Sequence, residues 1–330
     1  MIKPAPHGWI VLDKPRGLGS TQAVAAVKRN LRQAGYPKVK IGHGGTLDPL
    51  AEGVLPIALG EATKLCGRML DASKTYEFTI SFGEQTDTLD AEGEVAVRSD
   101  QRPPLAAIAA VLEHFTGEIE QVPPAFSALK VDGKRAYDRA RAGEDVELKT
   151  RRVTVHSLEM ASGGSRQPVD STFSVMSGRP DPFDAQAPLE LADTVTLVAN
   201  VSKGTYIRSL ARDIAHALGT VGHVIYLCRT RAGPFREEQA ISLDKLDEIG
   251  NGAPLKDLIL PLEAGLDGIP ALSLESAAAQ AVRQGRVITG LPQSDGLYCA
   301  MYGKVPVALL EIASGTTKIV RGFNFPDTAE

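Results

Sequence analysis

An aspartate on a glycine-rich turn is the residue of this sequence best suited to do chemistry. Asp48 lies in the run GHGGTLDP at residues 42–49. The proline that follows disfavours helical backbone at Asp48 and biases it toward an extended geometry. A carboxylate held in this way can act as a nucleophile or as a general base. In an isolated Leu-Asp-Pro, however, an Asx turn that only shapes a loop is the better interpretation.

The same glycine-rich run could instead bind a phosphate or a metal ion. It lacks the Gly-Lys-Ser/Thr ending of a triphosphate loop and the spacing of a dinucleotide fingerprint. His43 and Asp48 could be two metal ligands, but Glu52 is the one further donor nearby. We therefore expect neither a bound nucleoside triphosphate nor a metal ion.

Arg208 is a cation that could pair with such a carboxylate. It stands in GTYIRSL at residues 204–210, in the first turn of a predicted helix. A positive charge there opposes the helix dipole at a cost of about 0.3 to 1 kcal/mol, which indicates a partner anion. A guanidinium beside a carboxylate favours the ionised form of that carboxylate. From spacing alone, a side chain that extends into solvent is an equal alternative.

Two tyrosines stand beside these charged candidates. Tyr76 closely follows Lys74, and Tyr206 lies two residues before Arg208. Aromatic rings stack on bases in enzymes that take a base out of its helix. Most tyrosines are merely core or rim residues, but only 5% of this chain is aromatic. The two positions therefore indicate a base pocket without establishing one.

The elements that must position these residues form an α+β pattern rather than regular βαβ repeats. Tyr76 begins a predicted strand and Arg208 begins a predicted helix, whereas Asp48 lies on a turn. Strands are expected at 8–13, 76–83, 153–160 and 194–201. Helices are expected at 105–115 and 205–218, and a further helix, capped by Ser20 or Thr21, is expected to run to residue 31.

The chain is expected to divide near residue 250. Residues 1–250 form the predicted catalytic domain, 251–267 a linker rich in Gly and Pro, and 268–330 a small, mostly β module with one helix at 274–284. Residues 162–188, rich in Gly, Ser, Pro and Asp, are expected to be a flexible insertion.

Composition indicates an ordinary globular protein of 330 residues, 43% hydrophobic and 23% charged. Its three cysteines are far apart, so no disulfide framework is expected and a reducing cytoplasm fits best. The N-terminal segment lacks an apolar signal region, and no stretch reaches the length of a membrane span. We therefore expect a cytoplasmic protein without membrane insertion.

The net charge of −4 hides an uneven distribution. Residues 14–47 contain no Asp or Glu but seven Lys and Arg, and residues 214–236 form a second acid-free stretch. Any one cluster could be a solvated helix face. An acid-free window as long as the first favours a polyanionic partner instead.

Four blocks of this sequence, taken together, resemble the TruB family of tRNA pseudouridine-55 synthases. They are WIVLDKPRGLGST at 9–21, GHGGTLDPLAEGVLPIALGEATKL at 42–65, KTYEFTISFGEQTDTLDAEGEV at 74–95 and GTYIRSLARDIAHALGTVGHVIYLCRTRAG at 204–233. A fifth block, VPPAFSALKVDGKRAY at 122–137, resembles the RNA-gripping thumb segment, expected over about 122–150. The insertion at 162–188 is the main departure from the family pattern.

The resemblance implies a pseudouridine synthase fold, with a mixed, mostly antiparallel sheet flanked by helices. It also implies a small C-terminal PUA-like β-barrel that binds the acceptor end of tRNA. Such enzymes detach the T-loop uridine at tRNA position 55 from C1′ and rejoin it through C5, with no cofactor or metal. We expect tRNA, bound through its T-arm and acceptor end, to be the partner of a monomer.

The resemblance also assigns roles to individual residues. Asp48 would be the catalytic aspartate, acting as nucleophile at C1′ or as the base that removes the C2′ proton, and the sequence leaves both open. Arg208 would be its ion-pair partner, and Tyr76 would stack on the extruded base. Tyr206 and Leu227 would form further walls of the base pocket, and His43 would help to displace the base. Lys64 would lie near the phosphates or the active site, and Asp90 would contact the target nucleotide. Lys14 and Pro15 would support the active-site loop.

Two other functions compete with this interpretation. A tRNA-folding chaperone without turnover would use the same basic surfaces, but it would not need both Asp48 and Arg208. A carboxylate glycosidase would need a second acid near Asp48, for which Glu52 could be proposed. The basic surroundings fit a polyanion better than a neutral sugar.

Overall fold

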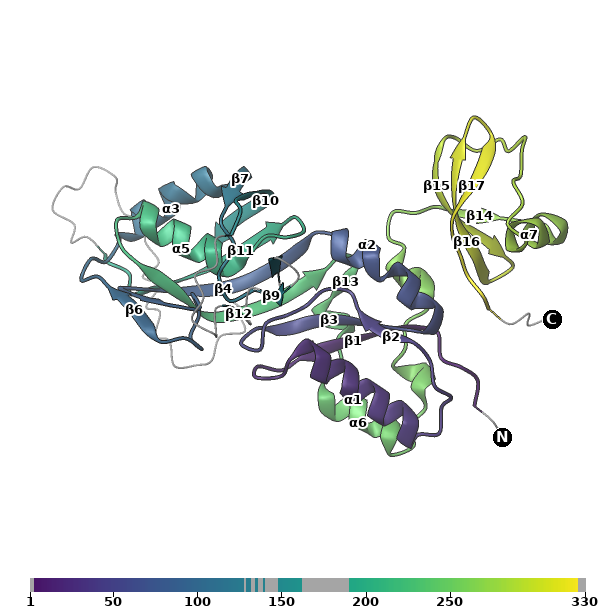
Figure 1. Cartoon of the computed structure of the whole chain (residues 1–330), viewed down its shortest axis with the longest axis horizontal. Helices are drawn as coiled ribbons and strands as arrows, with labels where there is room; N and C mark the ends of the chain where they lie inside the picture. Colours follow the sequence, from purple (N-terminus) through teal and green to yellow (C-terminus); the bar gives the residue numbers. More distant parts are fainter. Residues whose placement is uncertain are drawn as a thin grey trace. The chain divides into compact units, whose positions relative to one another are not determined.

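The computed structural model describes residues 3–127, 129–131, 134–135, 139, 148–161 and 190–325. The chain forms two compact units, each containing helices and strands (Figure 1). The first unit comprises residues 1–48, 53–72 and 231–330, and the second comprises residues 49–52 and 73–230. The predicted α+β class is confirmed.

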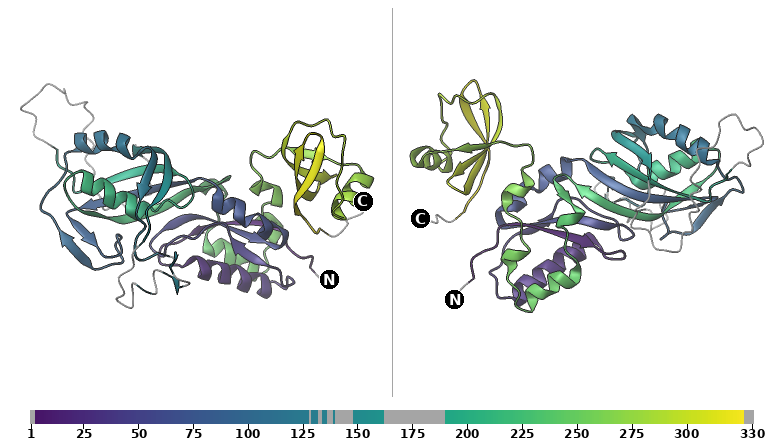
Figure 2. Two further views of the ribbon diagram at one scale, coloured as in Figure 1. Left: turned by 45° about the horizontal axis from the view of Figure 1, so that its top comes forward. Right: turned by 180° about the vertical axis from the view of Figure 1, so that it is seen from behind.

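The N-terminal part of the first unit is built on an antiparallel strand pair. Strand β1 (Gly8–Lys14) pairs with β3 (Glu52–Leu59), and the short β2 (Ile41–His43) also pairs with β3. Helices α1 (Ser20–Gln33) and α6 (Leu243–Gly250) lie side by side (Figure 2). Asn30 Nδ2 donates to Asp247 Oδ1 at 2.7 Å and ties the two helices together.

The start of α1 differs from the prediction that Ser20 or Thr21 caps it. The N-cap is Gly19, whose backbone N–H donates to Gln22 Oε1 at 2.7 Å. Glycine is acceptable at an N-cap, and the glutamine three residues later supplies the reciprocal bond of a capping box. The hydroxyl of Ser20 is therefore available for a bond outside the helix.

A core around Trp9 joins distant parts of the first unit. The Trp9 indole is fully buried, donates to the Leu262 carbonyl at 3.1 Å and lies 5.1 Å from the Phe235 ring. Its cluster includes Cys299, Leu309 and Phe323 from the C-terminal sheet. Four short elements contribute to this cluster: η1 (Gly60–Leu65), α2 (Cys66–Asp71), β13 (Phe235–Arg236) and η5 (Leu262–Gly265). The unit also contains η3 (Glu237–Gln239) and η4 (Leu255–Asp257).

The C-terminal segment forms a four-stranded sheet with one helix. The strand order is β14 (Ala271–Ser273), β15 (Gly296–Tyr302), β16 (Val305–Ala313) and β17 (Thr316–Gly322), and α7 (Ser276–Arg283) packs on β15 and β16. Only the β14–β15 pair is parallel. A small closed barrel was predicted here. In the described residues of this segment the sheet stays open, because β14 and β17 are its two edges.

The second unit contains a larger sheet with the strand order β12 (Gly222–Ala232), β4 (Lys74–Phe82), β11 (Thr194–Val201), β10 (Arg151–Met160) and β7 (Gly117–Gln121). The pairs β4–β11, β11–β10 and β10–β7 are antiparallel. Helices α3 (Leu105–Val111) and α5 (Ile207–Ala217) cover one face of this sheet (Figure 1), and η2 (Leu112–Phe115) extends α3. The second unit also contains two short strand pairs. Strand β5 (Glu84–Thr86) pairs with β6 (Val95–Arg98), and β8 (Lys130–Val131) pairs with β9 (Lys134–Arg135).

The predicted elements agree with these bounds to within a few residues. The strand expected at 194–201 has those limits, and the helix expected from 205 begins at Ile207, because Tyr206 is its extended N-cap. The insertion predicted at 162–188 lies outside the described residues, as does much of the predicted thumb at 122–150. No helix in the described ranges is long and apolar enough to cross a membrane.

Candidate active site

The turn that carries Asp48 is fixed by backbone hydrogen bonds on both sides. Leu47 N–H donates to Ser20 Oγ at 2.8 Å, and Ser20 Oγ donates to the Leu47 carbonyl at 2.9 Å. Both bonds are buried. Gly44 N–H donates to the Pro56 carbonyl at 2.8 Å. The half-buried Asp48 thus follows a residue whose backbone donor and acceptor are both bound by one hydroxyl of α1.

Glycine is required at the entry to this turn. A Cβ on Gly44 would lie 2.6 Å from Met69 Cβ, closer than carbon atoms approach without displacement. Gly45 has φ of 143°, a conformation that side chains other than hydrogen rarely adopt. The glycines therefore serve close packing and backbone geometry here. His43 Nδ1 accepts the Gly45 N–H at 3.4 Å, which orients the half-buried ring beside the turn.

A buried lysine organises the chain that leads into α1. Lys14 is fully buried, and its Nζ donates to the Leu18 carbonyl at 2.7 Å and to the Pro15 carbonyl at 3.0 Å. These bonds satisfy a charge that burial would otherwise penalise strongly. They also fold residues 15–18 into the turn that presents Ser20 to Leu47.

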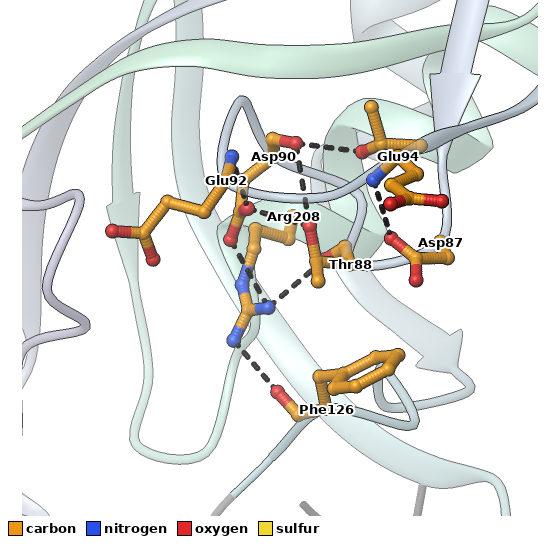
Figure 3. A network of polar contacts seen from close by, with 8 residues as sticks. Asp87, Thr88, Asp90, Glu92, Glu94, Phe126 and Arg208 are labelled. Atoms are coloured by element: carbon orange, nitrogen blue, oxygen red, sulfur yellow. Dashed lines mark hydrogen bonds and ion pairs between the residues drawn. The ribbon is translucent and has the colours of Figure 1, made fainter. Parts of the chain in front are cut away.

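Arg208 lies in the second unit, in a buried polar network (Figure 3). Its side chain is 6% exposed, which rules out the alternative that it extends into solvent. Nη1 lies 3.2 Å from Asp90 Oδ2 and donates to the Thr88 carbonyl at 2.9 Å, and Nη2 donates to the Phe126 carbonyl at 3.0 Å. A cation in the first turn of a helix indicated a partner anion, and Asp90 is one.

The Asp90 carboxylate is occupied by protein groups. Oδ1 accepts from Thr88 Oγ1 at 2.6 Å and from Glu92 N–H at 3.0 Å, while Oδ2 faces Arg208. The residue is 2% exposed. The contact expected between Asp90 and the target nucleotide remains a prediction.

Helix α5 also fixes the segment that follows β7. Ser209 Oγ donates to the Val122 carbonyl at 2.8 Å, and Arg212 Nη2 donates to the same carbonyl at 3.2 Å. Together with the bond from Arg208 to Phe126, they attach residues 122–126, the start of the predicted thumb, to the helix that carries Arg208.

Tyr206 is held by two residues that the sequence did not single out. The buried Gln121 binds both sides of its backbone, with Nε2 donating to the Tyr206 carbonyl at 3.1 Å and Oε1 accepting its N–H at 2.8 Å. The Arg151 guanidinium lies 5.2 Å from the centre of the Tyr206 ring, within range of a cation–π contact. No local pattern marks Gln121, because its partner is 85 residues away.

Tyr76 and Leu227 lie on neighbouring strands of the second unit. Tyr76, on β4, is half-buried and pairs with Ala199 across β11, while Leu227, on β12, is 5% exposed. Tyr226, beside Leu227, points to the opposite face of the strand. Burial raises the pKa of Tyr226 above its usual range, with smaller contributions from Cys228, Glu52 and Glu77, so its phenol stays protonated.

Lys64 is engaged with the C-terminal sheet. Its Nζ lies 2.7 Å from Glu61 Oε2 and donates to the Gly322 carbonyl at 2.9 Å, at the end of β17. Glu61 also accepts the Asn324 N–H. The position expected for Lys64 near substrate phosphates therefore remains a prediction.

The structure brings Arg208 together with Asp90 and orients the Asp48 turn through Ser20. Asp48 and Arg208 belong to different compact units, so the ion pair expected between them remains a prediction. A carboxylate on a fixed turn and a buried guanidinium are groups that can attack a sugar carbon or remove a proton and can stabilise developing charge.

Comparison with known proteins identifies the relatives of this chain. A model of the TruB family pseudouridylate synthase N-terminal domain matches residues 28–179, and one of the tRNA pseudouridylate synthase B C-terminal domain matches residues 208–267. A protein of Novosphingobium aromaticivorans named tRNA pseudouridine synthase B is 63% identical and spans 98% of this chain and 99% of its own length. A protein of the same name from Zymomonas mobilis is 52% identical, and the match spans 98% of this chain and 99% of that protein.

Solved structures support the same fold. A structure of an H/ACA RNP bound to a substrate RNA containing 2'-deoxyuridine superposes with a TM-score of 0.67 and 26% identity, over 97% of this chain and 86% of that one. A chain of the archaeal box H/ACA sRNP Nop10-Cbf5 complex gives a TM-score of 0.65 and 26% identity, over 97% of this chain and 87% of that chain. The predicted pseudouridine synthase fold is confirmed.

Proposed function

The chain belongs to the TruB family and is an enzyme that isomerises uridine in tRNA, and we propose that its target is the T-loop uridine at position 55 with Asp48 as the catalytic aspartate. The observation that carries the assignment of Asp48 is the turn itself. A side chain that takes part in chemistry must be held close to its productive geometry, and the Ser20–Leu47 bonds fix the backbone directly before Asp48.

The reaction breaks the bond between N1 of uracil and C1′, rotates the base, and forms a bond from C5 to C1′; the C5 proton is released and N1 takes up a proton, so the product is an isomer of the substrate. Asp48 acts at the sugar, either by attacking C1′ or by removing the C2′ proton. In both cases its carboxylate must be ionised when the base leaves. Every group in this sequence of steps belongs to the chain or to the RNA.

Arg208 is proposed as the cation that pairs with Asp48 in the substrate complex. Its guanidinium presents five donors in a planar fork, a geometry that suits a carboxylate. In this arrangement Asp90 positions Arg208, and a polar contact with the target nucleotide is its second proposed role.

The extruded uracil is proposed to stack on Tyr76, with Tyr206 and Leu227 as the further walls of the pocket. The Tyr206 backbone is held by Gln121 and its ring is covered by Arg151, so it provides a fixed wall rather than a mobile one. His43, at the end of β2, is proposed to help displace the base, and Lys64 to act near the RNA phosphates.

The T-arm is proposed to bind along residues 1–250, and the acceptor end on the RNA-binding module of residues 268–330, in a monomer. The described elements of that module are the four-stranded sheet β14–β17 and α7. Stacking and charge, rather than a dedicated cofactor, would supply the binding energy for RNA.

Tritium release from unmodified tRNA labelled at uridine C5 tests whether the target uridine is the one at tRNA position 55. We expect release from a tRNA that carries uridine at position 55 and none from a matched tRNA with cytidine there. Equal release from both transcripts would refute the assignment to the T-loop. A transcript with a different T-loop uridine replaced serves as the control for correct folding of the RNA.

A further inference from the structure

A basic pocket lies beside α1, and none of the proposed site residues lines it. Its volume is about 370 Å³, which is large enough to admit a nucleotide-sized group. Its lining comes from one face of α1 and from the segment that leads into β2, all within the first unit. The cations of this lining are Lys28, Arg29, Arg32 and Lys38.

The pocket exists because the chain reverses at the end of α1. Gly35 takes φ of 74°, and the Tyr36 N–H donates to the Leu31 carbonyl at 3.0 Å, which closes the helix. Residues 37–41 then run back beside the helix into β2. Val39 and Ile41 give the pocket apolar walls, while the lysine and arginine heads stay at its exposed edge.

The fold explains only part of this charge. Arg29 Nη2 lies 3.2 Å from Asp247 Oδ1, and Arg32 lies in the last turn of α1, where a cation is favourable. Lys28 and Lys38 form no ion pair with a described residue, and neither stabilises the helix end. Lys28 and Arg32 stand four residues apart on the helix, where like charges repel.

We propose that this pocket binds the phosphodiester backbone of the tRNA substrate. The chain carries a net charge of −4, yet these cations gather on one exposed face with no acid in residues 14–47. A phosphate between Lys28, Arg32 and Lys38 would relieve their repulsion and complement their charge.

The place of the pocket in the chain fits this role. Ile41 lines the pocket and begins β2, which ends at His43, so β2 spans about 7 Å from the pocket toward the Asp48 turn. Both lie in the first unit. The proposed RNA would therefore contact the pocket and the Asp48 turn on the same unit. Phosphate contacts of this kind fix register without reading sequence.

The test is tRNA binding by the triple variant Lys28→Ala/Arg32→Ala/Lys38→Ala as a function of salt. The matched control, Arg98→Ala/Lys245→Ala/Lys256→Ala, removes three exposed cations outside the pocket. If the pocket binds phosphates, the slope of log K against log salt falls by roughly 2 to 3, and affinity near 0.1 M salt falls by at least about tenfold. The control should change both by much less.

Slopes and affinities that are equal for the two triple variants would overturn the proposal. Binding of an acidic peptide that is lost with the triple variant, while tRNA binding is unchanged, would overturn it as well. Should the triple variant fail to fold, Lys38→Glu in the exposed loop gives the same test, with an expected slope change of about 1. Because binding needs no turnover, this result is separate from the assignments of Asp48 and position 55.

Discussion

Removing the Ser20 hydroxyl should impair catalysis through the backbone of Leu47. Ser20→Ala leaves α1 intact, because alanine is the best helix former and the N-cap is Gly19. It removes the donor to the Leu47 carbonyl and the acceptor of the Leu47 N–H. The residue directly before Asp48 then loses both of its bonds to the helix.

The size of the effect follows from the two bonds. Each is worth about 0.5 to 1.5 kcal/mol, and a buried N–H left without a partner costs about 1 to 3 kcal/mol, so we expect a loss of about 2 to 3 kcal/mol in the free energy of unfolding. A displacement near 1 Å at a reacting group can cost about 100-fold, so kcat should fall by about 10- to 100-fold. Binding of tRNA should change little.

The assay compares Ser20→Ala with Thr21→Ala. Thr21 is the exposed neighbour on the same helix turn, and its substitution should change stability by less than about 0.5 kcal/mol. Urea denaturation gives the stability, and tritium release at saturating tRNA, well below the melting temperature, gives kcat. A variant that loses stability but keeps full kcat would refute the view that Ser20 positions Asp48.

Three further outcomes follow from other sites. Asp90→Asn removes the buried negative charge beside Arg208 and should lower the free energy of unfolding, measured in urea, by about 3 kcal/mol. The exposed Asp87→Asn should cost under about 1 kcal/mol, and equal effects of the two substitutions would contradict the role given to the Asp90–Arg208 pair. Tyr76→Ala should lower turnover more than tRNA binding, because stacking is worth about 1 to 3 kcal/mol, and Tyr76→Phe should retain both; parallel losses would argue against the base pocket. Burial raises the pKa of the Cys66 thiol above its usual range, and burial also raises the pKa of the Cys299 thiol, to about 11. Alkylation of both thiols at pH 8, followed by mass spectrometry, should therefore be much slower in folded than in unfolded protein.

Local patterns in the sequence were enough to predict most of the elements. The alternation of Thr194–Val201 marks a strand with the limits it has in the structure, and the apolar spacing of α5 predicts its helix to within two residues. The start of α1 was misassigned because serine is also a good N-cap. Only the position of Leu47, 27 residues away, shows that the Ser20 hydroxyl is used elsewhere.

The contacts of the candidate site were harder to predict, because they join distant segments. Arg208 could be recognised as a cation that needs an anion, since it opposes the dipole of its own helix. Nothing local identifies Asp90, which is 118 positions earlier, as that anion. Gln121 and Arg151 are equally unmarked, because polar residues on strands are common and their contacts with Tyr206 depend on tertiary packing.

If Asp48 performs the chemistry, its role can be isolated by measuring tritium release in a single turnover. With enzyme in excess over C5-labelled tRNA, wild-type protein should release the label, and Asp48→Asn should release none while still binding tRNA. Glu52→Gln, which changes the nearby carboxylate, should keep its activity. Full release of label by Asp48→Asn would show that Asp48 is not the catalytic residue. Loss of release in Glu52→Gln alone would show the same.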